Sequence, residues 1–226
     1  MIKILTCISI CFGVFCFPRS CKFLGDISMR ILVIGASGTI GSAIVQQLGS
    51  NVELITASRS GASFTLDIAD SESIKAMFSK LSGLDAVVCA VGVAAYAPLF
   101  KLGDGDFERG IHNKLMGQVN LVRFGAEAMA PHGSFTLTGG LASRKPFESG
   151  GALISMCNAG LEGFVRAASR ELPRNIRLNV IAPGWVRETL VKLKMDPMLG
   201  VPAMRVAERY VEAIQGKMSG QVLDVD

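Results

Sequence analysis

The stretch Met29-Arg-Ile-Leu-Val-Ile-Gly-Ala-Ser-Gly-Thr-Ile-Gly41 decides the fold of this chain. Its apolar part, residues 31–34, is a short β-branched-rich run that stops at a glycine, which is typical of a strand buried on both faces of a parallel sheet. Three glycines follow at three-residue spacing, and residues 42–48 then carry apolar side chains at helical spacing. The stretch therefore predicts a strand, a glycine turn and a helix.

This arrangement is typical of a dinucleotide site. The first glycine permits the tight turn, the second lets the backbone approach a ligand, and the third lets the helix pack on the strand. Free N–H groups at the start of the helix can then bind a diphosphate. A plain tight turn is the alternative that a glycine triplet alone leaves open. The cofactor-binding residues predicted in this segment are Gly35, Ser37, Gly38, Thr39, Ile40 and Gly41.

A second predicted strand, residues 52–56, ends in Ala57-Ser58-Arg59-Ser60. A Rossmann fold places here the group that recognises the adenosine ribose. No acidic residue is present to bind a free 2′-hydroxyl, whereas Arg59 offers a charged planar fork and Ser58 a hydroxyl, which suit a 2′-phosphate. The segment therefore predicts an NADP(H) site, and a solvated surface arginine is the alternative for Arg59.

The first 28 residues differ from the rest of the chain. An apolar run from Ile4 to Phe17 stands behind Lys3, and four of the six cysteines lie here. A positive end before an apolar run resembles a secretory signal, but no small-x-small cleavage site follows it. The run is also shorter than the about 20 apolar residues that a membrane span needs. Three interpretations stay open: an extension upstream of a start at Met29, a signal or anchor, and an ordered element. NADP(H) chemistry belongs inside cells, so the sequence favours the extension and a cytoplasmic protein.

Residues 29–226 are enough for one domain with a substantial core. The whole chain carries a formal net charge of +4, without a basic stripe that has interleaved aromatic residues, so we expect no nucleic-acid binding. Only Cys89 and Cys157 lie in this segment, and neither has metal-ligand spacing with a histidine. We therefore expect reduced cysteines, no metal site, and no membrane contact unless residues 1–28 are retained.

Predicted strands and helices alternate along the domain. The strands are expected at 31–34, 52–56, 63–66, 86–90, 134–138, 176–181 and 221–225. The helices are expected at 42–48, 71–81, 107–129, 152–172 and 201–214, the second of them with Ser71 as its N-cap. Such alternation requires right-handed crossovers. The sequence predicts a single doubly wound α/β Rossmann fold, with a parallel sheet of about seven strands and helices on both faces.

From Arg30 to Val225 the chain resembles the short-chain dehydrogenases/reductases. The glycine turn is similar to the cofactor loop of that family, although the more usual spacing there is Gly-x-x-x-Gly-x-Gly. Cys89-Ala-Val-Gly92 stands where the family has Asn-Asn-Ala-Gly, and Pro183-Gly-Trp-Val186 is similar to its turn beside the nicotinamide. The resemblance implies further cofactor-binding residues at Asp67, Ile68, Ala90, Val91, Gly92, Pro183, Gly184 and Val186.

The usual catalytic residues of that family are absent. The family uses a Tyr and a Lys four residues later, the cation lowering the pKa of the phenol so that it exchanges a proton with the substrate oxygen. Alignment on the corresponding helix puts Ile154 at the Tyr and Asn158 at the Lys. The usual Ser falls near Gly140 or Leu141, and Lys114 stands where the family often has a structural Asn.

Other residues could replace the missing proton donor. Lys114 is on a helix expected to border the site, where burial near the cofactor lowers the pKa of an ammonium. Thr138 ends the fifth strand, and a Ser143/Lys145 pair follows in the next loop. The alternatives are a solvated Lys114, a Thr138 hydroxyl bonded to the backbone, and a plain loop charge at Lys145.

Two classes of function follow. The first is an NADP(H)-dependent oxidoreductase that acts on a small carbonyl or alcohol substrate, and the second is a sensor or scaffold that binds NADP(H) without turnover. The two long helices at 107–129 and 152–172 are expected to pair with a second copy in a homodimer or homotetramer. The apolar residues expected to drive this pairing are Leu115, Val119, Leu161, Phe164 and Val165. The substrate loop is expected at 187–198.

Overall fold

The computed structural model of the chain describes residues 28–226. The apolar segment before Met29, called the leader below, lies outside the described residues, and so do its three interpretations. Seven parallel strands form one sheet in the order β3-β2-β1-β4-β5-β6-β7. Their bounds are β1 (Met29–Ile34), β2 (Val52–Ser58), β3 (Phe64–Thr65), β4 (Leu84–Cys89), β5 (Met129–Thr138), β6 (Arg177–Pro183) and β7 (Val222–Val225).

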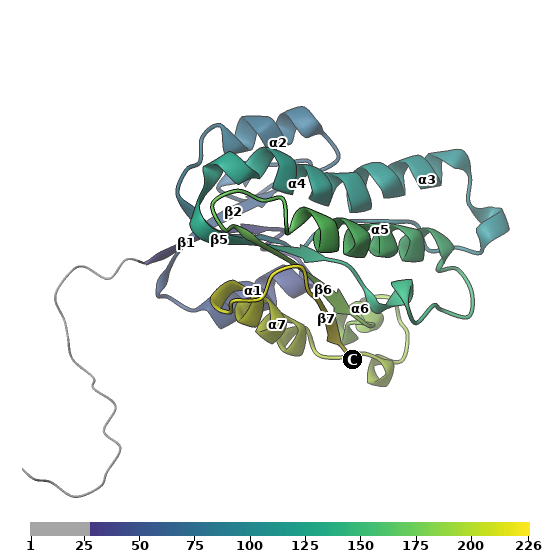
Figure 1. The fold of residues 1–226 in the computed structure, drawn as a ribbon. Coiled ribbons are helices and arrows are strands. Elements are labelled where there is room, and N and C mark those ends of the chain that lie inside the picture. The colour runs from purple at the N-terminus through teal and green to yellow at the C-terminus, as the bar shows by residue number, and fades with distance from the viewer. Residues whose placement is uncertain (1–27) are drawn as a thin grey trace, which may run out of the picture.

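Helices cover both faces of the sheet (Figure 1). The first face carries α2 (Ser71–Phe78), α3 (Asp104–Gly110), α4 (Gly117–Gly125) and α5 (Ala152–Ala168), and a π-helical stretch (Ile111–Met116) joins α3 to α4. The other face carries α1 (Thr39–Leu48), α6 (Arg187–Lys192) and α7 (Ala203–Gln215). This arrangement confirms the predicted doubly wound α/β Rossmann fold with a seven-stranded parallel sheet.

The sheet separates two apolar cores. Alternate residues of β1 point to opposite faces, so Leu32 and Ile34 pack beneath α2 and α4 while Ile31 and Val33 pack against α1 and α7. All four side chains are at most 1% exposed. The β-branched run read from the sequence is therefore a central strand covered on both faces.

Several predicted boundaries are wrong. The N-cap of α2 is Asp70, whose carboxylate accepts a hydrogen bond from the amide of Glu72, and Ser71 is instead the first helical residue. The helix expected at 107–129 begins at Asp104 and ends at Gly125, because Met129 already pairs with Leu84 in the sheet. The helix expected at 152–172 ends at Ala168, and the expected loop at 187–198 contains α6.

None of the helices within residues 28–226 has both the length and the apolar composition required to cross a bilayer.

Candidate functional site

The glycine turn brings the ends of β1, β2 and β4 together. Gly35 has φ +85° and its amide donates to the carbonyl of Ala57 at 2.8 Å. A Cβ on Gly35 would lie 2.3 Å from Cγ1 of Val91, and one on Gly41 would lie 1.9 Å from the carbonyl oxygen of Gly35. Both positions require glycine, because backbone and a neighbouring loop occupy the space where a side chain would stand.

The first turn of α1 is open to an anion. Its N-cap, Gly38, provides no side-chain cap, and no acidic residue lies in the first turn. Among the described residues, the amides of Thr39, Ile40 and Gly41 have no hydrogen-bond acceptor. Unpaired N–H groups at the positive end of a helix dipole bind phosphate oxygens. The residues present therefore fit the diphosphate of a dinucleotide.

The adenosine side of this site is polar and exposed. Arg59 follows the end of β2 and lies in solvent, without a carboxylate partner within residues 28–226. Ser58 donates its hydroxyl to the carbonyl of Ser60. Asp67 is exposed and accepts the amide of Ala69 at 3.0 Å, whereas Ile68 is buried beside Gly117. Arg59 is thus a cation without a partner in the described residues, at the position where the sequence predicted ribose recognition.

Lys114 is buried, so the solvated-lysine alternative is wrong. It lies in the π-helical stretch between α3 and α4 and is 5% exposed. Its ammonium donates to the carbonyls of Thr138 at 2.9 Å and Gly139 at 3.2 Å, at the end of β5. π-Helical turns are rare and often occur at functional sites. Here the π-helical stretch places a cation beneath the carboxyl ends of two central strands.

Burial changes the acidity of Lys114. The loss of hydration lowers the pKa of its ammonium from 10.5 to about 8, while the neighbouring Cys89 and Cys157 act weakly in the opposite direction. Gly92, with φ +141°, lies against the lysine, since a Cβ there would approach Cδ of Lys114 to 2.9 Å. The ammonium is therefore an acid that titrates near neutral pH at the end of β4 and β5.

Gln118 extends this buried network. Its amide oxygen accepts the N–H of Thr138 at 2.8 Å, and its amide nitrogen donates to the carbonyl of Thr138 at 2.9 Å and to that of Lys114 at 3.0 Å. Gln118 is fully buried. It therefore fixes the end of β5 relative to the helix that carries Lys114.

The Thr138 hydroxyl is held inside the protein. It contacts the carbonyl oxygen of Cys89 and lies 2.5 Å from the hydroxyl of Tyr210, which is itself fully buried on α7. Burial raises the pKa of Tyr210, so this phenol stays protonated. These contacts match the alternative in which the Thr138 hydroxyl is bonded to backbone, and they favour Lys114 over Thr138 as a proton donor.

The expected Ser143/Lys145 pair is not formed. Ser143 donates to the carbonyl of Gly140 and to the carboxylate of Glu162. Lys145 pairs with Asp226 at 2.5 Å and is exposed. The two side chains are thus drawn to different carboxylates, which explains why neighbours in sequence do not act together.

The residues at the usual catalytic positions form a tight neutral corner. Ile154 is half-buried on α5, and Asn158 is 1% exposed one helical turn further on. A Cβ on Gly140 would lie 2.7 Å from Nδ2 of Asn158, so a serine there would be crowded. The Oδ1 atom of Asn158 is buried without a hydrogen-bond partner in the described structure.

An aromatic cluster of Tyr96, Phe147 and Trp185 lies beside this corner, and the sequence analysis missed it. The rings of Phe147 and Trp185 stack with centroids 4.9 Å apart, and Tyr96 meets them edge-on at 5.5 Å and 5.9 Å. The three residues come from the loops that follow β4, β5 and β6. In open α/β sheets this edge is where ligands bind. Aromatic residues in the loops after three successive strands are the signal that sequence reasoning could have used.

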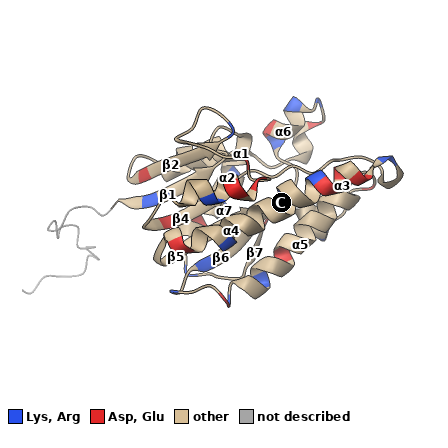
Figure 2. Ribbon diagram, turned by 90° about the horizontal axis from the view of Figure 1, so that it is seen from above, with Lys and Arg blue, Asp and Glu red and all other residues tan. Residues whose placement is uncertain are grey.

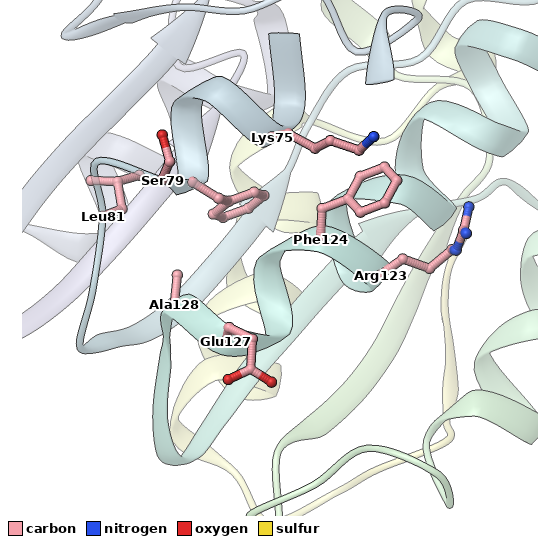
Figure 3. A pocket seen from close by; sticks show the side chains of 8 residues that line it. Lys75, Ser79, Leu81, Arg123, Phe124, Glu127 and Ala128 are labelled. Atoms are coloured by element: carbon pink, nitrogen blue, oxygen red, sulfur yellow. The ribbon is translucent and has the colours of Figure 1, made fainter. Parts of the chain in front are cut away.

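Two cavities lie elsewhere. One, of about 460 Å³, opens between the ends of α2 and α4, where Lys75 lies over the ring of Phe124 (Figure 3). The other, of about 570 Å³, is lined by Arg144, Arg166, Arg170 and neighbours before β7. Both are outside the loops that carry the glycine turn and Lys114. Within residues 28–226, no three His, Cys, Asp or Glu side chains gather as metal ligands do.

The comparisons with known proteins place the chain in a family. A family model described as enoyl-(acyl carrier protein) reductase matches residues 38–201. The protein lin1944 of Listeria innocua has a similar structure, with a TM-score of 0.84, 38% identity, and coverage of 88% of this chain and 100% of that one. The chain belongs to the short-chain dehydrogenases/reductases, and its fold is that of this family of oxidoreductases.

Two further relatives are described by their activity or ligand. A human 3-oxoacyl-[acyl-carrier-protein] reductase is 27% identical over 225 residues, covering 86% of this chain and 94% of the human protein. A small-chain dehydrogenase in complex with NADPH has a TM-score of 0.77 and 28% identity, covering 88% of this chain and 97% of that one. The alignments therefore span nearly the whole of both relatives.

Proposed function

We propose that this protein is an NADP(H)-dependent oxidoreductase that acts on a small carbonyl or alcohol substrate. The observation that carries the proposal is the combination of an anion-ready glycine turn with the uncompensated Arg59 at the end of β2. The turn suits a diphosphate, and the guanidinium suits a 2′-phosphate. The similar dehydrogenase solved with NADPH supports this choice of cofactor.

The bound cofactor supplies hydride transfer, and this chain must supply binding and a proton. Gly35, Gly38 and Gly41 hold the diphosphate at the start of α1. Gly92 and Gly184 lie in the loops after β4 and β6, at the carboxyl edge of the sheet where open α/β folds bind ligands. These groups bind and orient the cofactor without taking part in proton transfer.

Lys114 is the proton donor in this proposal. Its ammonium is the buried acid that titrates near neutral pH at the ends of β4 and β5, and it has three protons for two carbonyl acceptors. A general acid works best when its pKa is close to the working pH. Because only the protonated form donates, carbonyl reduction should fall with rising pH above about 8.

A binding titration beside an activity screen tests this function. NADPH and NADH are titrated by the change in nicotinamide fluorescence, and the oxidation of NADPH is followed with aldehydes, ketones and quinones. Preferred binding of NADPH with turnover that Lys114→Met abolishes is the expected result. The variant should bind NADPH within about threefold of the parent, since the lysine acts on the substrate. Equal affinity for both cofactors contradicts the choice of NADP(H).

The neutral corner at Ile154 and Asn158 favours a second candidate, a sensor or scaffold that binds NADP(H) without turnover. This candidate keeps the glycine turn and Arg59 but needs no proton donor. Tight binding of NADPH by the parent, with no oxidation of NADPH by any substrate in the screen, supports it over the enzyme.

We further propose that the protein is a cytoplasmic homodimer or homotetramer that pairs through α4 and α5. Three of the five residues first expected to drive pairing, Val119, Leu161 and Val165, are instead buried in the core. The outer face of α5 carries the small residues Ala159, Gly163 and Ala167 and one exposed charge, Arg166, and few charged positions lie along the helix (Figure 2). Small, uncharged side chains allow a second helix to approach closely.

A further inference from the structure

Lys192, the last residue of α6, contacts the first residue of α1, which directly follows the glycine turn. Its ammonium lies 2.7 Å from the hydroxyl oxygen of Thr39, the first residue of α1, although 153 positions separate the two in sequence. Within residues 28–226, Lys192 has no carboxylate within ion-pair distance. A cation therefore lies over the start of a helix.

This juxtaposition is electrostatically unfavourable by itself. The N-terminus of a helix carries a partial positive charge, and cations are disfavoured there. The first turn of α1 has no acidic residue that would compensate, and the amides of Thr39, Ile40 and Gly41 also need acceptors. The ammonium of Lys192 and these three amides are thus hydrogen-bond donors that face the same region. An anion between them would accept hydrogen bonds from both.

The position of Lys192 follows from packing of the rest of α6. Leu190 is fully buried, and the amide of Arg187 donates to the carbonyl of Val201 at 2.8 Å. Glu188 turns away from the site, where its carboxylate accepts the amide of Ala203 at the start of α7. The carboxylate of Glu188 is therefore occupied at the start of α7, whereas the ammonium of Lys192 contacts the first residue of α1.

We propose that Lys192 is a binding residue for the diphosphate of the dinucleotide, held from one side by the amides of α1 and from the other by this ammonium. The inference rests on the proposed nicotinamide cofactor and adds a contact from a distant element. Arg59 distinguishes NADPH from NADH, whereas Lys192 contacts a group that both cofactors share. Loss of Lys192 therefore weakens both cofactors equally.

Lys192→Gln tests the contact, with Lys194→Gln as the matched control. Both variants remove one exposed positive charge near the end of α6, and Gln at 192 can still reach Thr39. Dissociation constants for NADPH and NADH are measured by fluorescence at several salt concentrations. We expect about a tenfold loss for both cofactors in Lys192→Gln and little change in the control. The salt dependence of binding should also become weaker, because one charge contact is lost. Lys192→Arg should restore the affinity.

The melting temperature of the protein without ligand distinguishes a ligand contact from a structural one. If Lys192 serves the diphosphate, Lys192→Gln leaves this temperature unchanged or raises it, since a cation leaves the positive end of α1. A lower melting temperature in Lys192→Gln than in Lys194→Gln, or equal cofactor affinities in the two variants, overturns the inference.

Inorganic pyrophosphate separates this inference from the proposed function. We expect pyrophosphate to raise the melting temperature of the parent, and Lys192→Gln to remove that rise. If this occurs in a protein that binds neither NADPH nor NADH, the diphosphate contact stands and the cofactor proposal fails. If NADPH binds and neither probe responds to Lys192, the cofactor proposal stands and this inference fails.

Discussion

Replacement of the buried Lys114 by methionine should change how the stability of the protein depends on pH. Methionine has a similar length and no charge, so it removes one titrating group from the space beneath the ends of β4 and β5. Lys114 is 5% exposed, and its pKa is lowered from 10.5 to about 8 by burial. In the unfolded chain the side chain is hydrated and keeps its ordinary pKa.

The sign of the effect follows from proton binding. Below pH 8 both the folded and the unfolded chain carry the proton on Lys114, and the cost of burying a charge is fully present. Between about pH 8 and 10.5 the unfolded chain binds a proton that the folded chain has lost, so the free energy of unfolding rises with pH. The slope approaches about 1.4 kcal/mol per pH unit, which amounts to about 3 kcal/mol over the whole range.

Urea unfolding of the parent and of Lys114→Met at pH 7, 8 and 9 measures the contribution of Lys114 to the pH dependence of the free energy of unfolding. The difference in free energy of unfolding, parent minus variant, should rise by about 1.4 kcal/mol between pH 7 and 9. The difference cancels the titrating groups that both proteins share and that do not interact with Lys114. A difference that stays constant over this range refutes the reasoning, because the lysine would then keep an ordinary pKa in the folded protein.

Four further outcomes are expected. Arg59→Ala should lose about 10- to 100-fold of the preference for NADPH over NADH in binding titrations, with NADH affinity unchanged, because a charge-assisted contact to the 2′-phosphate is removed; an unchanged preference counts against Arg59. Ile154→Tyr combined with Asn158→Lys should increase NADPH-dependent carbonyl reduction if only the proton donor is missing, whereas no gain points to the sensor or scaffold. A chain that starts at Met29 should be soluble and should bind cofactor, because β1 begins there; aggregation of this chain alone would make the leader structural. Gly163→Glu, on the outer face of α5, should reduce the mass measured by light scattering, and a parent that is already monomeric at micromolar concentration contradicts the pairing.

The stretch from Met29 to Gly41 predicted a strand, a glycine turn and a helix by itself, because its signals are local. A β-branched run stays extended, a glycine adopts positive φ at Gly35, and the helix follows from apolar spacing. Each of these preferences acts within a few residues. The parallel, doubly wound sheet then followed from the alternation of elements, since a crossover helix allows few other topologies.

Helix ends and caps were less predictable, because two neighbouring polar residues compete for the same role. Asp70 and Ser71 are both good N-caps, and the choice between them depends on where the preceding chain leaves β3. The sheet likewise sets the end of α4. Met129 pairs with Leu84 in the sheet, so the helix ends before it, at Gly125.

The candidate site depends on contacts that no local pattern specifies. The sequence offered Lys114 and Thr138 as proton donors, but only the packing of the π-helical stretch against β5 buried the first, and only the path of α7 brought Tyr210 to the second. The approach of Lys192 to Thr39 joins two segments that lie 153 positions apart in the sequence. The sequence by itself determined which backbone conformations each segment prefers, and the tertiary structure alone decided which distant side chains meet, because strand order and helix register set those distances.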